Sequence, residues 1–152
     1  MNRPSTLIAF FIVLFITACS ASTSISHQGG IEISNVNVVL PAAMAGMDMG
    51  SDPFVSMRIK NASGVDDRLV GVTSDFAEAM LNETVMNGDV ATMKDLTSVD
   101  VPAGTTLEFK HGGFHIMFVN PSKELKAGDS IKLTLEFEKA GKITVSASVT
   151  NE

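Results

Sequence analysis

The chain has 152 residues, which at about 100–200 residues per domain is enough for one domain. Hydrophobic residues make up 45% and charged residues 18%, so the composition excludes a disordered, solvated segment. The formal net charge of −6 argues against a nucleic-acid-binding protein, which usually presents a basic face. The single cysteine excludes an internal disulfide and a multi-cysteine zinc or iron–sulfur site. The nine methionines therefore need either a packing role or a role as soft metal ligands.

Residues 1–18 are predicted to be a targeting segment. Arg3 precedes an apolar run from Leu7 to Ile16, which is shorter than the roughly 20 residues that span a bilayer but suits a signal-peptide core. The run ends in Ile-Thr-Ala-Cys19, which resembles a bacterial lipobox and implies cleavage before Cys19 and lipidation of its sulfur. The alternative is an ordinary secretory signal with an incidental cysteine. We therefore expect a lipid anchor on the periplasmic side of the bacterial envelope, and Ser20 favours the outer membrane.

The rest of the chain divides into a tether, residues 19–30, and a β domain, residues 31–152. The tether is small and polar, which predicts flexibility. From Ile31 onward, short alternating apolar segments are separated by turn signals, as is typical of strands. The expected strands are 31–40, 54–60, 68–73, 79–86, 90–96, 105–109, 114–119, 131–138 and 143–149. The predicted fold class is therefore all-β, an antiparallel sandwich or barrel of about eight strands.

One segment between the first two of these strands has a different character. Residues 41–53, here called the methionine loop, show no strand pattern and contain Met44, Met47 and Met49 among helix-breaking residues. No periodicity places these methionines in a core, and the segment resembles the methionine-rich tracts of copper-handling proteins. Copper binding by the loop and a role without metal both remain open at this point.

The strand 114–119 carries a pair of side chains with metal-binding chemistry. Because residues alternate between the two faces of a strand, Phe114, Ile116 and Phe118 are assigned to the core. His115 and Met117 then share the other face, roughly 6–7 Å apart by strand rise. Imidazole and thioether together suit copper, and thioether selects Cu(I) over harder ions. The alternative is a surface histidine beside a methionine that fills a gap.

The spacing of Met93, His115 and Met117, with twenty-one residues and then one residue between them, resembles the PCuAC family of periplasmic copper chaperones. Further segments that look like the family are 83–93, 101–104, 112–117, 66–71, 125–129 and 133–137, so the resemblance covers about 31–149. It implies a cupredoxin-like fold and Cu(I) binding through Met93, His115 and Met117. It also implies delivery of copper to the dinuclear centre of a haem–copper oxidase, with a second copper chaperone as another partner.

The chain departs from the family motif at its first ligand. Counting back from Met93 places that ligand at Asn82, whose amide oxygen is a hard and weak partner for Cu(I). Met80 lies two residues earlier, on the same strand face, and offers a replacement, although core packing is its simpler explanation. Closure of the methionine loop over the ion is the other way to complete the site.

These observations favour an envelope Cu(I) chaperone that is a lipid-anchored monomer, is not an enzyme and does not bind nucleic acid. Its expected partner is a copper-accepting envelope protein, such as an oxidase subunit or a second copper chaperone. Copper sequestration and a metal-free partner-binding module are the alternatives. Blue-copper electron transfer is disfavoured, because that site needs a cysteine thiolate and the only cysteine is the lipidation candidate.

Overall fold

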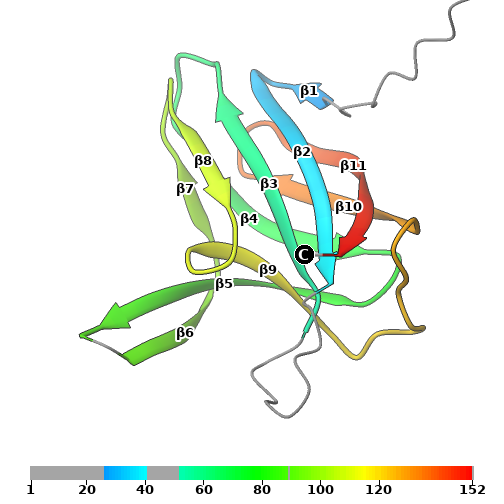
Figure 1. Ribbon diagram of the computed structural model, residues 1–152. Helices are drawn as coiled ribbons and strands as arrows, with labels where there is room; N and C mark the ends of the chain where they lie inside the picture. Colours follow the sequence, from blue (N-terminus) through cyan, green and yellow to red (C-terminus); the bar gives the residue numbers. More distant parts are fainter. Residues whose placement is uncertain (1–25, 41–51, 89, 152) are drawn as a thin grey trace, which may run out of the picture.

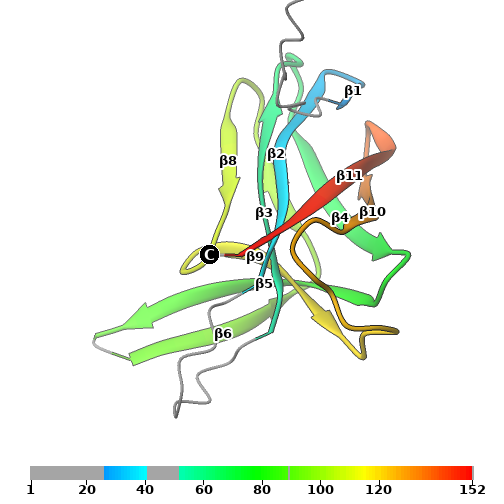
Figure 2. The same ribbon diagram turned by 45° about the vertical axis from the view of Figure 1, so that its right-hand side comes forward.

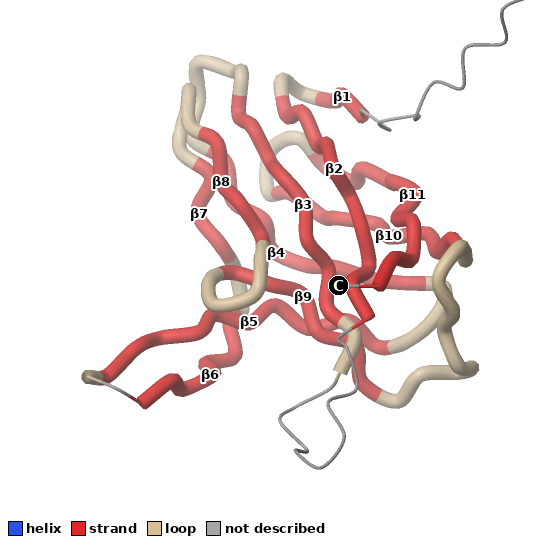
Figure 3. The backbone as a smooth tube through the Cα atoms, in the orientation of Figure 1, coloured by secondary structure: helices blue, strands red, loops and turns tan. Residues whose placement is uncertain are grey.

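The computed structural model describes residues 26–40, 52–88 and 90–151, and in this part of the chain it consists of strands and loops (Figure 3). The strands are β1 (Ser26–Gln28), β2 (Ile31–Leu40), β3 (Phe54–Asn61), β4 (Asp67–Ser74), β5 (Glu78–Asn87), β6 (Val90–Leu96), β7 (Val99–Val101), β8 (Thr106–Phe109), β9 (Phe114–Val119), β10 (Ser130–Phe137) and β11 (Gly141–Asn151). Within these residues there is no helix long and apolar enough to cross a membrane. The predicted signal peptide, Cys19 and the methionines of the methionine loop lie outside the described residues.

The strands form a single unclosed sheet in the order β6-β5-β9-β8-β3-β2-β11-β10-β4-β7, with β1 paired to β2 (Figure 1). The predicted all-β class is confirmed. The pairing is mixed rather than wholly antiparallel, because β11 pairs with β2 and β8 pairs with β9 in parallel. The pairing of β11 with β2 joins strands that are far apart in the sequence, whereas β8 and β9 follow each other and share the single pair Phe109 and Phe114.

The core is built from the alternating faces of the strands. In β10 and β11 every second side chain is buried, and Leu133 lies opposite Val145 while Leu135 lies opposite Ile143. Each fully buried aliphatic side chain of this kind contributes about 1.5–3 kcal/mol. The core-facing side of β9 adds the buried side chains of Ile116 and Phe118 to this core, as the alternation predicts.

A β-bulge in β2 changes which positions face the core. Ile31 and Ile33 are buried before the bulge, and Val36 and Val38 are buried after it. The register with β3 shifts between Ser34 and Asn37, and Asn35 adopts a positive φ of 54°. The extra residue keeps both apolar pairs on the inner face, although their spacing breaks the two-residue period.

The structure adds two short strands to those expected from the sequence. Ser26–Gln28 pairs with β2, so the ordered sheet begins inside the segment predicted to be a tether. Val99–Val101 pairs with β4 and buries two valines. Three-residue strands carry too little alternation to be distinguished from turns before their partners are known.

The segment 66–71, which looks like the PCuAC family, has a structural role centred on Asp67. This buried carboxylate accepts hydrogen bonds from the backbone N–H groups of Arg68 (2.7 Å), Lys139 (2.9 Å) and Ala140 (2.9 Å). Asp67 therefore ties the start of β4 to the turn between β10 and β11.

The β5–β6 hairpin projects from the rest of the sheet in both ribbon views (Figures 1 and 2). β6 is the end strand of the sheet, whereas β9 has neighbours on both sides. This difference decides how exposed the candidate ligands are.

Candidate metal site on β5, β6 and β9

Three adjacent strands place the predicted ligands on one face of the sheet. His115 lies directly opposite Asn82, and Met117 lies directly opposite Met80. Met93 lies opposite Thr84, two residues along β5 from Asn82. Directly opposed residues share a face, as do residues two apart on one strand. The face that carries Met80, Asn82, Met93, His115 and Met117 is called the methionine face below.

His115 is held in one tautomer by a backbone carbonyl. Its Nδ1 lies 2.9 Å from the carbonyl oxygen of Gly113. A carbonyl only accepts hydrogen bonds, so Nδ1 carries the proton and donates it, which leaves the Nε2 lone pair for a metal. Such an outer hydrogen bond orients metal-binding histidines. The Gly112-Gly113 pair before His115 is typical of a turn, but nothing in the sequence indicates that the Gly113 carbonyl orients the histidine.

His115 is buried, although the sequence places it on the face of the strand opposite the core residues Ile116 and Phe118. Only 4% of the residue is exposed, because β9 is flanked by β5 on one side and by β8 and β3 on the other. The alternative of a surface histidine is therefore wrong, because the face of β9 that carries His115 is covered there, and Met117 on the same face is half-buried.

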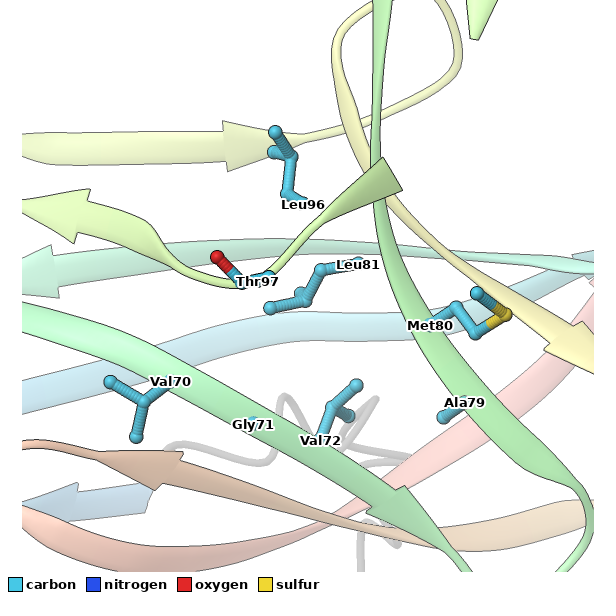
Figure 4. A pocket seen from close by; sticks show the side chains of 8 residues that line it. All are labelled: Val70, Gly71, Val72, Ala79, Met80, Leu81, Leu96 and Thr97. Atoms are coloured by element: carbon cyan, nitrogen blue, oxygen red, sulfur yellow. The ribbon is translucent and has the colours of Figure 1, made fainter. Parts of the chain in front are cut away.

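Met117 and Met80 form a cross-strand pair. Both are half-buried, and Phe54 of β3 lies opposite Met117 on its other side. In Figure 4 the Met80 side chain extends toward β9 and away from Val70. Met80 and Met117 therefore share a face, and Met80 is placed to act as a thioether donor beside Met117.

Met93 lies further out than the other candidates. It is 57% exposed on the edge strand β6, and β5 separates it from His115. Strand spacing and rise place the Cα atoms of Met93 and His115 about 12 Å apart in a flat sheet. The two side chains would have to lean toward each other across Asn82 to hold one ion.

Asn82 lies at the centre of the methionine face. It is 4% exposed, faces His115 and lies between that histidine and Met93. Its Nδ2 donates a hydrogen bond to the Met80 carbonyl oxygen at the long distance of 3.5 Å. A stronger metal ligand at position 82 would lie between Met93 on β6 and His115 on β9 and would connect the two. The amide of Asn82 is a weak ligand for Cu(I), so the departure from the family motif falls at the central position of the candidate site.

The described residues form no cluster of three or more His, Cys, Asp or Glu side chains that would hold a metal. A cavity of about 240 Å³ opens between β4 and β5, lined mainly by apolar residues such as Val70, Val72 and Leu81 (Figure 4). Met80 is among the residues that line this cavity, whereas Asn82, Met93, His115 and Met117 are not. The cavity therefore adjoins the methionine face only at Met80.

Comparison with solved structures defines the class of fold. The copper-bound PCuAC domain from PmoF2 is 25% identical, with a TM-score of 0.66 over 85% of this chain and 99% of that domain. The Cu(I) form of DR1885 from Deinococcus radiodurans is 27% identical, with a TM-score of 0.58 over 86% of this chain and 81% of that chain. The fold is that of the PCuAC domains, and the resemblance indicated by the sequence is confirmed.

The family follows from the sequence comparisons. A family model described as "Putative lipoprotein LpqE-like" matches residues 31–149. "Putative lipoprotein Lxx21020" of Leifsonia xyli subsp. xyli is 32% identical over 146 residues, which cover 91% of this chain and 84% of that protein. The chain belongs to the LpqE-like family.

Proposed function

We propose that this protein is an envelope carrier of Cu(I), anchored by a lipid on Cys19, that binds copper through Met93, His115 and Met117. The observation that carries the proposal is the methionine face, where His115 offers a free Nε2 beside thioether donors. Imidazole and thioether donors with no thiolate suit Cu(I) as a cargo. The copper in the two solved PCuAC relatives supports the same ion here.

The gradient of exposure along this face suits transfer of the ion. Met93 is exposed at the edge of the sheet, Met117 is half-buried and His115 is buried. An acceptor can therefore contact Met93 first and draw the ion outward by exchanging one ligand at a time. Met80 serves as an additional inner donor, since it faces Met117 across β5 and β9.

The expected acceptor is a copper-binding envelope protein, such as an oxidase subunit or a second copper chaperone. The family description and the lipobox-like segment support a lipid anchor, with the periplasmic side of the outer membrane as the proposed location. A stably held lipoprotein needs more than one acyl chain, which the modification of a bacterial lipoprotein cysteine supplies.

The test is an anaerobic titration of the full chain, purified in detergent, against a chromogenic Cu(I) chelator. We expect one tightly held equivalent, retained when Met44, Met47 and Met49 are replaced by leucine. Loss of that equivalent in the triple variant would assign copper to the methionine loop and favour sequestration. If the protein does not compete with the chelator for Cu(I) at all, the carrier function is contradicted, and the metal-free partner-binding module is the remaining explanation.

Asn82→His is expected to tighten Cu(I) binding at least tenfold. The new imidazole would lie directly opposite His115 and between that residue and Met93, where it supplies a donor that the amide lacks. The matched control is Glu83→His, which places an imidazole on the opposite face of the same strand, away from His115 and Met93. An unchanged affinity in Asn82→His would show that another residue, such as Met80, already completes the site.

A further inference from the structure

The tip of the β5–β6 hairpin carries a methionine that the family motif does not include. Met86 is 60% exposed and Met93 is 57% exposed, so neither side chain is explained by packing in the core. Met86 lies opposite Ala91, and Met93 lies opposite Thr84. By this register Met86 is on the methionine face, one step nearer the tip than Met93.

The register also places the two sulfur atoms within reach of each other. Met86 and Met93 are diagonal neighbours on adjacent antiparallel strands, a relationship in which Cα atoms lie about 7–8 Å apart and long side chains meet. Their directly opposed partners, Ala91 and Thr84, are small and leave room for the methionines to lean together.

The charges on the hairpin are compatible with a cation at this position. Among its described residues, the charged side chains on the methionine face are both acidic: Asp95 lies opposite Asn82, and Glu78 lies two residues before Met80. Glu83 and Lys94 lie opposite each other and therefore on the other face, so the lysine does not face the two sulfur atoms.

We propose that Met86 and Met93 form an outer thioether pair that binds a soft monovalent cation, Cu(I) or Ag(I), at the end of the hairpin. The biological choice of Cu(I) rests on the proposed carrier function. In that role the outer pair binds the ion first during loading and last before transfer to an acceptor. Met93 belongs both to the outer pair and to the inner site, which is the proposed site at Met93, His115 and Met117. The projection of the hairpin from the sheet presents the pair to a partner (Figures 1 and 2).

The test follows the methionine ε-methyl resonances of the full chain by NMR as Ag(I) is added, with each signal assigned by a Met→Leu variant. In a variant that lacks the inner donors, His115→Ala with Met117→Leu, we expect the Met86 and Met93 signals to shift together. Met86→Leu should then lower the Ag(I) affinity of this variant at least tenfold. Val85→Ala, an exposed apolar change on the opposite face of the same strand, is the matched control and should leave the affinity within twofold.

The two proposals fail in different ways. A Met86 signal that stays unchanged while Met93 shifts would overturn the outer pair, whatever the inner site does. In the wild-type chain, a lack of response from the Met117 signal would contradict the inner site of the carrier. That result would leave the outer pair in place if Met86 and Met93 still shift together.

Discussion

Replacing His115 with alanine is expected to weaken Cu(I) binding at least tenfold, which is about 1.4 kcal/mol of binding free energy. The variant removes the imidazole whose Nε2 is left free by the hydrogen bond from Nδ1 to the Gly113 carbonyl. Met117→Leu should have an effect of the same size, because leucine keeps the apolar volume and removes the sulfur. Competition with a Cu(I) chelator measures both affinities.

The control for these variants is Met57→Leu. Met57 is 3% exposed and lies on the core side of β3, so the same exchange removes a sulfur far from the methionine face. A volume-conserving exchange of this kind usually costs less than about 1.5 kcal/mol of stability, and we expect no change in copper affinity. Because His115 is buried, urea unfolding must show that His115→Ala is folded before its affinity is interpreted. Wild-type affinity in folded His115→Ala and Met117→Leu would exclude both residues as ligands.

The second large effect is expected on stability. Asp67→Ala should lower the free energy of unfolding by about 3–5 kcal/mol, because it leaves three backbone N–H groups without their shared acceptor. The turn between β10 and β11 would lose its connection to β4. The measurement is the shift of the urea midpoint at constant m-value.

Asp100→Ala is the matched control for this variant. Asp100 also faces β4, where it accepts a hydrogen bond from Arg68 Nε at 2.7 Å and holds the pKa of that guanidinium above its ordinary value. This ion pair is exposed to water and screened by salt, so its loss should change stability far less than the loss of Asp67. Equal destabilisation by the two changes would contradict the role assigned to the buried carboxylate.

Several features of the site could be predicted from the sequence because they depend on neighbours along one strand. The alternation in 114–119 separates His115 and Met117 from Ile116 and Phe118 without knowledge of any other strand. The same rule identifies β10 and β11, whose buried residues follow every second position. The dipeptide Asn87-Gly88, which is typical of hairpin turns, likewise lies where β5 ends and the chain turns into β6.

Features that depend on distant partners could not be predicted in this way. The burial of His115 follows from the three strands that flank β9, and the sequence alone does not order those strands. The bulge at Asn35 changes the period of β2 to suit its pairing with β3. The parallel pairing of β11 with β2 joins the two ends of the domain.

By itself, then, the sequence determined the all-β class, the faces of the regularly alternating strands and the imidazole and thioether side chains of the candidate site, since each of these depends on local period or chemistry. Only the tertiary structure decided that Asn82 faces His115, that Met80 faces Met117, and that Met86 lies beside Met93 on a projecting hairpin. Those relationships depend on strand register, and a shift of one residue would move each side chain to the other face of the sheet.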